Sequence, residues 1–299
     1  MITETVVGIE YQKPKVILLN QSGIGSAEIA ARTCYDSFSN SENIWVKDFP
    51  GLVDDIHDNP PGHQSILNNI NQTKDSELLD SLAWTYHHHS IMEHASLTYY
   101  ISGTSRGVLQ EHARHRLQAI SVRSTRYTMS DVLYIFIASQ RNSDSKSWFI
   151  QKISELDMFV VVGQDQLFEA AQLYEKLLHQ QIKLGSQEFL RTCLSKTNLE
   201  NYNTNKSNSA LDIFKSLQQG KKKRNVGDSF KWVVTDNWKV DLVVTFNLRS
   251  LKNYFDLRNS GAAWFQIQWL AEEMKKATPK KYLKLIDKET RNANKTTKI

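Results

Sequence analysis

Imidazole and guanidinium side chains gather in one stretch of forty residues, between His87 and Arg126. Six of the nine histidines lie between His87 and His115, and five arginines lie between Arg106 and Arg126. The run RHRLQAISVRSTRY at positions 114–127 contains no acidic residue. Guanidinium groups bind phosphate through paired hydrogen bonds, and hydroxyl groups complete the acceptor shell. We therefore expect this run to bind phosphorylated ligands through Arg114, Arg116, Ser124 and Arg126.

The excess of positive charge also allows two other interpretations. Considered alone, the arginine run could be an ordinary solvated helix end. The formal net charge of +5 suits any polyanion, nucleic acid included. However, the lysine run GKKKRN at positions 220–225 is short, and the sequence carries no nucleic-acid-binding motif. We therefore expect no nucleic-acid partner, and phosphorylated small molecules remain the ligands that the charge favours.

The histidines raise the question of a metal site, because imidazole and carboxylate are ligand types that zinc prefers. The residues concerned are His87, His88, His89, Glu93 and His94. Their spacing does not match the His-Glu-x-x-His pattern of helical zinc sites. Adjacent residues on a helix point about 100° apart, so the histidine triplet cannot converge on one ion unaided. We expect no metal.

The cysteines and the apolar segments indicate in which cellular compartment the protein works. Cys34 and Cys193 are the two cysteines, and neither has a second thiol nearby in the sequence. A disulfide framework and a cysteine-ligated zinc are therefore not expected. The N-terminus lacks an apolar signal core, and no apolar run approaches the length of a membrane span. We expect a cytoplasmic protein without a membrane partner.

Several patterned segments position the cationic stretch. Residues 15–19 (KVILL) predict a strand, and residues 27–34 predict the helix that follows a glycine turn. The turn Gly23-Ile24-Gly25 begins like a dinucleotide-binding fingerprint, but Glu28 stands where a third glycine is needed. Asp75 or Ser76 can cap a helix that ends near the histidine triplet. A strand is expected over residues 95–101.

A second helix should deliver the arginines. Thr104 or Ser105 can cap it, and Val108, Leu109 and Ala113 share one side. The run Arg114–Arg116 then lies at its C-terminus, where cations interact favourably with the helix dipole. Further on, residues 139–190 show helical spacing, residues 241–247 predict a strand, residues 249–257 predict a helix, and the apolar spacing of residues 263–274 predicts a final helix.

Two polar segments interrupt this pattern. Residues 196–228 predict a loop-rich insertion, and residues 286–299 predict a disordered tail that is too polar to pack. We expect the rest, residues 1–285, to form a single catalytic domain.

The cationic run carries a family resemblance. Arg114, His115 and Arg116, followed after seven residues by Ser124, match the RHR-x7-S signature of flavin-dependent thymidylate synthases. The similarity extends to the Ser-x-x-Glu-His element at residues 90–94 and to residues 247–258, and spans roughly residues 85–270. The resemblance implies the α/β (α+β) fold of that family, with a central mixed or antiparallel sheet and helical layers.

The resemblance also implies an activity and its ligands. Members of the family methylate dUMP to dTMP, with 5,10-methylenetetrahydrofolate as the carbon donor and FAD reduced by NADPH. They use no cysteine nucleophile, and they form homotetramers with shared active sites. The implied flavin contacts are Ser90, Arg114, His115, Arg116, Val122, Asn247, Arg249 and Asn253. The implied dUMP contacts are Glu111, His112, Ala113, Arg114, Val122, Arg123, Ser124, Thr125, Arg126, Lys231 and Arg258.

Within this set, Arg258 is the expected catalytic residue, because a fixed cation beside the uracil stabilises negative charge developing on N3 and O2. Arg249 and Asn253 are four residues apart on the predicted helix, so they share a face. The sequence departs from the usual family pattern at Ala119, Ser121, Lys231 and Ala262. Of these, Lys231 keeps the charge of the usual arginine but loses its two-pronged geometry.

Overall fold

Four strands with alternating burial form the main sheet of the protein. They are β3 (Lys15–Gln21), β4 (Ser96–Ser105), β5 (Gln118–Val122) and β6 (Lys239–Asn247), in the spatial order β3-β4-β6-β5. β3 and β4 pair antiparallel, with a register shift between Leu18 and Asn20. Along β6 every second side chain is buried, beginning at Val240, as expected for a strand with one face on the core.

The computed structural model describes residues 2–58, 63–74, 76–140, 142–179, 200, 228 and 230–296. The chain divides into two compact units. Unit 1 comprises residues 1–13, 103–108 and 122–240, and unit 2 comprises residues 14–102, 109–121 and 241–299. The single catalytic domain expected over residues 1–285 stays a prediction. Most of the expected insertion at 196–228 lies outside the described residues.

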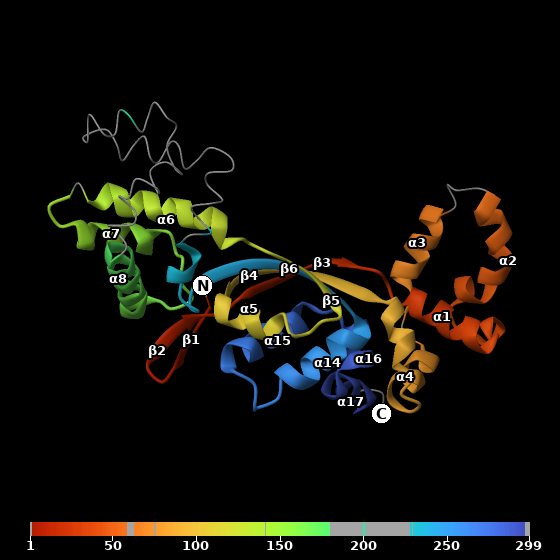
Figure 1. The fold of residues 1–299 in the computed structure, drawn as a ribbon. Helices are drawn as coiled ribbons and strands as arrows, with labels where there is room; N and C mark the ends of the chain where they lie inside the picture. The colour runs from red at the N-terminus through yellow and green to blue at the C-terminus, as the bar shows by residue number, and fades with distance from the viewer. Residues whose placement is uncertain are drawn as a thin grey trace. The chain divides into compact units, whose positions relative to one another are not determined.

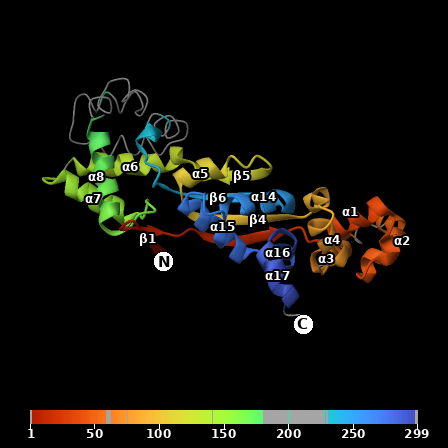
Figure 2. The same ribbon diagram turned by 90° about the horizontal axis from the view of Figure 1, so that it is seen from below.

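Unit 2 contains a layer of two helices packed against the sheet. α14 (Leu248–Arg258) and α15 (Phe265–Ala277) lie on one face of the sheet (Figures 1 and 2). Their apolar side chains build the core there, and eight of them are no more than 2% exposed. These eight are Leu248, Leu251, Tyr254, Phe255, Ile267, Leu270, Ala271 and Met274. The strand, the helix and the final helix predicted for this region are confirmed.

Unit 2 contains further helices before and after this layer in the chain. They are α1 (Gly25–Tyr35), η1 (Phe38–Asn40), α2 (Ile44–Asp58), α3 (His63–Gln72), α4 (Glu77–Trp84), η3 (His89–His94), α16 (Lys280–Ile286) and α17 (Lys288–Thr296). Ser76 caps α4, because its side chain accepts a hydrogen bond from Leu79 N at 3.4 Å. The predicted helix and its cap are therefore confirmed.

The glycine turn of unit 2 has a packing role. A Cβ atom at Gly23, whose φ is +72°, would lie 2.4 Å from the Ile70 carbonyl oxygen. A Cβ atom at Gly25 would lie 2.6 Å from Thr73 Oγ1. Both glycines thus allow the close approach of the backbone at the end of α3, which accounts for them without a dinucleotide.

Unit 1 contains a hairpin of β1 (Thr3–Val6) and β2 (Ile9–Gln12), followed in the chain by α6 (Thr125–Ser139), α7 (Ser145–Glu155), α8 (Gly163–His179) and η4 (Lys231–Val233). Val7 and Gly8 have φ of +51° and +83°, the signs required by a two-residue hairpin turn. Within the expected helical region 139–190, helix is confirmed in α7 and α8, and residues 180–190 lie outside the described residues. Between these two helices, Phe159 and Val161 form isolated β-bridges, so continuous helix there is wrong.

The C-terminal tail differs from the prediction of disorder. Residues 288–296 form α17, whose Arg291 donates two hydrogen bonds of 2.8 Å to the Asp80 carboxylate of α4. The Arg291 guanidinium also lies 5.4 Å from the Trp84 ring centroid. Polar composition predicted disorder because it shows no apolar face, whereas the segment docks through charge and cation–π contacts.

Candidate functional site

The arginine-rich turn follows α5 (Arg106–His112) directly. Ser105 caps this helix through a hydrogen bond from Val108 N to Ser105 Oγ at 3.1 Å, which confirms one of the two predicted caps. The helix ends at His112, and backbone hydrogen bonds from Arg114 N to Glu111 O and from His115 N to His112 O tighten the turn. Arg114–Arg116 therefore project from the end of α5, as predicted.

The second set of polar residues lies on α14. Asn247 caps this helix, since its side chain accepts a hydrogen bond from Ser250 N at 2.8 Å. Arg249, Lys252, Asn253 and Asp256 follow at spacings of three and four, which places them on one face.

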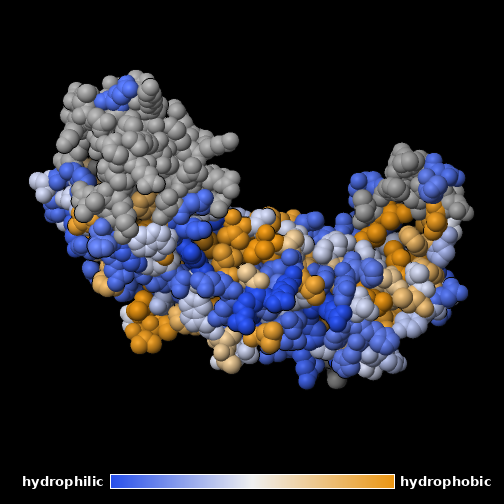
Figure 3. Space-filling view, in the orientation of Figure 1, coloured by the Kyte–Doolittle hydropathy of each residue, from blue (hydrophilic) through white to orange (hydrophobic). Residues whose placement is uncertain are grey.

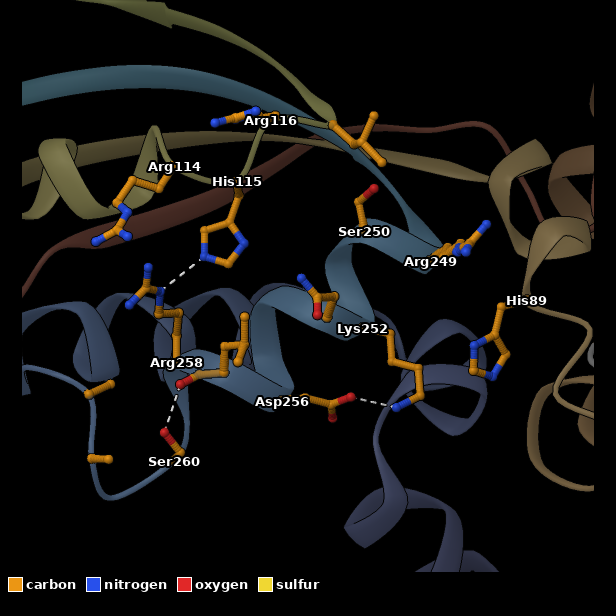
Figure 4. A pocket seen from close by; sticks show the side chains of 15 residues that line it. His89, Arg114, His115, Arg116, Arg249, Ser250, Lys252, Asp256, Arg258 and Ser260 are labelled. Carbon is orange, nitrogen blue, oxygen red and sulfur yellow. Dashed lines mark hydrogen bonds and ion pairs between the residues drawn. The ribbon is translucent and has the colours of Figure 1, made fainter.

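These two sets line one pocket of about 950 Å³ in unit 2 (Figure 4). Two sequence blocks more than one hundred residues apart supply most of its wall. The lining comprises His89, Arg114, His115, Arg116, Leu117, Arg249, Ser250, Lys252, Asn253, Asp256, Leu257, Arg258, Ser260, Ala262 and Ala263. Six residues expected to bind flavin or dUMP thus share one cavity: Arg114, His115, Arg116, Arg249, Asn253 and Arg258.

Arg258 is the most constrained side chain of this pocket. Its Nε donates to His115 Nε2 at 3.0 Å, and its two terminal nitrogens donate to Glu111 Oε2 at 2.9 Å and to the Glu111 carbonyl at 3.2 Å. A guanidinium carries five N–H groups, so two of them are left for a ligand. The guanidinium is therefore held in place before any ligand binds.

His115 is a neutral ring with a defined tautomer. Because Arg258 Nε can only donate, His115 Nε2 accepts, and the ring proton lies on Nδ1. Burial, together with the nearby charges of Arg258 and Arg114, lowers the pKa of His115 to about 4. Its Nδ1 lies on the side of the ring away from Arg258 (Figure 4). His115 thus offers one N–H donor without a net charge.

The pocket is cationic even after its ion pairs are counted. Five cationic side chains line it, and three are paired: Arg258 with Glu111 at 2.9 Å, Arg249 with Glu93 at 2.5 Å and Lys252 with Asp256 at 2.6 Å. Five cations and three carboxylates leave a net charge of +2, histidines not counted. Figure 3 shows a strongly hydrophilic surface over α5 and α14.

The remaining charge belongs to Arg114 and Arg116. Both are exposed, and within the described part of the chain neither has a hydrogen-bonded or ion-paired side chain. Two unpaired guanidinium groups beside a held third one suit a phosphate or pyrophosphate group.

His112 lies behind the pocket wall. Its side chain is fully buried, and its Nδ1 lies 3.0 Å from the hydroxyl of Tyr254. The helix α5 directs this side chain towards the core, away from the pocket, and the expected contact of His112 with dUMP stays a prediction. The neighbouring Glu111 does reach the pocket wall through its bonds to Arg258, and Ala113 is exposed.

Other predicted residues lie outside the pocket wall. Ser90 is exposed in η3, and the Asn247 side chain is engaged as the cap of α14. The expected ligands Val122, Arg123, Ser124, Thr125, Arg126 and Lys231 belong to unit 1, and the side chain of Arg126 is outside the described residues. Lys231 is exposed in η4, where its carbonyl accepts a hydrogen bond from Arg106 at 3.2 Å.

Lys252, Asp256 and His89 line the pocket without having been predicted. A signal for the first two was present in the sequence. Lys252 follows Arg249 by three residues, and Asp256 follows Lys252 by four, so helical spacing alone extends the Arg249 face to both. His89 comes from η3, and nothing local indicates that it meets α14.

The histidine triplet turns at the end of α4. His87 has φ of +55°, His88 Nδ1 lies 2.7 Å from the Tyr35 hydroxyl, and His89 Nε2 lies 3.1 Å from the Ala83 carbonyl. Among the described residues, no group of three or more His, Cys, Asp or Glu side chains could hold a metal ion. None of the described helices combines the length and the apolar character that crossing a membrane requires.

Comparison with known proteins agrees with the family resemblance of the sequence. The family model described as thymidylate synthase complementing protein matches residues 17–282. A protein of Campylobacter jejuni named flavin-dependent thymidylate synthase is 29% identical over 209 residues, covering 70% of this chain and 78% of that protein. A protein of the same name from Wolinella succinogenes is 26% identical over 267 residues, covering 89% and 94%.

A solved structure shares the fold. The crystal structure of thymidylate synthase X from Helicobacter pylori, with FAD and dUMP, is 23% identical and superposes with a TM-score of 0.55, covering 92% of this chain and 97% of that one. The expected α+β fold with helical layers is therefore confirmed.

Proposed function

Because the chain belongs to the thymidylate synthase complementing protein family, we propose that it is a flavin-dependent thymidylate synthase that methylates dUMP to dTMP. One observation carries this function beyond the family match. Residues 114–116 and 249–258, the two blocks that resemble the family, line a single cationic pocket. Such a pocket is suited to two phosphorylated ligands.

The residues present fit FAD and dUMP. Arg114 and Arg116 supply unpaired guanidinium groups for phosphate, and Arg249 and Asn253 add donors from one face of α14. His115 Nδ1–H supplies an uncharged donor. When bound, FAD supplies the reducing equivalents, with NADPH as its reductant and 5,10-methylenetetrahydrofolate as the source of the methylene carbon.

Arg258 acts on the uracil ring in this proposal. Its guanidinium stabilises the negative charge that develops on N3 and O2 as the ring becomes nucleophilic, and its two uncommitted N–H groups can donate to the carbonyl oxygen O2. Glu111 and His115 hold the guanidinium at 2.9 and 3.0 Å, so little reorganisation is needed when substrate arrives. Neither Cys34, which is exposed on α1, nor Cys193, which lies outside the described residues, has a part in this chemistry.

The dUMP contacts expected at Val122, Arg123, Ser124, Thr125, Arg126 and Lys231 remain part of the proposal. The proposed assembly is a cytoplasmic homotetramer with active sites shared between subunits. Ile17 and Leu19 support self-association, since these apolar side chains are 56% and 55% exposed on the edge strand β3.

The experiment is a set of omission reactions. Purified protein is stripped of flavin and incubated with dUMP, 5,10-methylenetetrahydrofolate, NADPH and FAD, and dTMP is quantified. Formation of dTMP that requires both FAD and NADPH is the expected result. Absence of dTMP in a folded protein that binds FAD would refute the activity, and absence of FAD binding would refute the cofactor assignment as well.

A further inference from the structure

A buried pair of polar side chains lies directly behind the pocket wall. His112 and Tyr254 are both 0% exposed, and His112 Nδ1 lies 3.0 Å from the Tyr254 hydroxyl. His112 Nε2 is buried and makes no close hydrogen bond within the described residues, although the Gln118 side chain interacts with the ring and partly offsets the lowering of its pKa. A buried polar group without a close partner destabilises the folded state. Two apolar side chains would fill this space without that penalty, so the pair calls for an explanation.

The pair connects to the pocket through aromatic packing. The Tyr254 ring lies 4.7 Å from the His115 ring at an angle of 64°, an edge-to-face arrangement. His112 itself packs edge-on against Phe246 at 5.8 Å and against Tyr254 at 5.2 Å. The hydrogen bond between the Tyr254 hydroxyl and His112 therefore restricts movement of the Tyr254 ring, against which the His115 ring packs.

Helix geometry extends the connection to Arg258. Tyr254 and Arg258 are four residues apart on α14, while His112 is the last residue of α5 and His115 lies three residues further on. The helix α14 therefore contacts the end of α5 and the turn that follows it at two places. His112 meets Tyr254 in the core, and His115 meets Arg258 at the pocket wall. A shift of the His112–Tyr254 pair in the core moves the His115 ring. It therefore also moves His115 Nε2, which accepts the hydrogen bond from Arg258 Nε.

We propose that His112 and Tyr254 are positioning residues that hold His115 and Arg258 in their working orientation for the proposed methylation of dUMP. Neither side chain reaches the pocket, so their effect acts through His115. Burial lowers the pKa of His112 to about 4, in keeping with a neutral ring that serves as a hydrogen-bond partner and not as a charge.

Four variants test this proposal. Tyr254→Phe and His112→Leu each break the bond, and His112→Gln keeps an amide able to bond the Tyr254 hydroxyl. Tyr99→Phe is the matched control, because Tyr99 is equally buried and its hydroxyl lies 2.7 Å from Thr278 Oγ1, away from the pocket-lining residues. Each variant is assayed as the FAD-loaded protein for kcat and for the KM of dUMP.

We expect Tyr254→Phe and His112→Leu to lower kcat about tenfold or more, since small misplacement of reacting groups has large rate effects. The KM of dUMP should stay within threefold. His112→Gln should recover kcat to within threefold of wild type, and Tyr99→Phe should stay within twofold. A kcat within twofold of wild type in Tyr254→Phe, or equal losses in all four variants, would overturn the proposal.

A second measurement is independent of turnover and separates this proposal from the proposed function, on which its kinetic readout rests. Nitrogen NMR of protein labelled at histidine reports which ring nitrogen of His115 is protonated. We expect protonation at Nδ1 in wild type and Tyr99→Phe, and a mixture of tautomers in Tyr254→Phe. An unchanged His115 signal in Tyr254→Phe would overturn the positioning role even if wild type forms no dTMP.

Discussion

Acid should destabilise this protein through His112, and the size of the effect follows from its burial. The pKa of His112 is lowered from 6.5 to about 4, chiefly by burial, with the neighbouring His115 adding to the shift. The unfolded chain therefore binds a proton at a higher pH than the folded one. Stability from this group is complete above pH 6.5 and is lost as the pH falls from 6.5 towards 4.

The magnitude can be worked from the two pKa values. One pKa unit corresponds to about 1.4 kcal/mol, and linkage between pH 7 and pH 5 with these values gives a loss of about 2 kcal/mol. The pKa of His115 is also lowered to about 4, because of burial and of the charges of Arg258 and Arg114. His115 adds a smaller loss of stability, since it is only partly buried. Wild type should lose at least the His112 contribution over this range.

The assay is urea unfolding followed by circular dichroism at pH 7 and pH 5, at one protein concentration. His112→Gln cannot titrate, so its free energy of unfolding should fall by about 2 kcal/mol less than that of wild type. His57→Gln is the matched control, because the His57 side chain is 86% exposed on α2, and it should follow wild type. Equal losses in wild type and His112→Gln would refute the depressed pKa.

Three further predictions concern single arginines. Arg258→Lys keeps the charge but not the three held N–H groups, so dTMP formation should fall about 100-fold or more, and turnover within tenfold of wild type would contradict the role of Arg258. Arg114→Ala should weaken binding of dUMP or FAD about tenfold, which calorimetry can measure, because an exposed phosphate partner contributes about 1–2 kcal/mol; unchanged affinities for both would exclude it as a phosphate ligand. Arg291→Ala should lower the free energy of unfolding by about 1–2 kcal/mol through loss of its two bonds to Asp80, and no change would show that docking of α17 adds nothing to stability.

Local pattern predicted several elements well. The alternation of residues 241–247 and the helical spacing of 249–257 correspond to β6 and α14, and Ser76 and Ser105 act as the caps that their type and position indicate. These features depend on neighbours close in sequence, which a periodicity records directly. β5 and α6 escaped prediction because the cationic run was interpreted as ligand-binding chain and not as regular structure.

The local pattern was insufficient where distant contacts decide the outcome. The tail looked disordered by composition, yet Arg291 meets Asp80 more than two hundred residues earlier in the chain. His112 lies within the resembling block, but it is the last residue of α5, and its side chain faces Tyr254 in the core. Neither contact can be predicted from the residues that are neighbours in the sequence.

The sequence by itself determined the family and the chemistry of the site, since an arginine–histidine–arginine run with a distant serine and a helix carrying Arg249, Asn253 and Arg258 are sets of functional groups independent of packing. Only the tertiary structure decided which of these groups share a cavity and in what state. Arg258 gains its orientation from Glu111 and His115, and His115 gains its tautomer from Arg258. Such properties depend on distances between α5 and α14 and on exclusion of water, and both arise only when the two elements pack together.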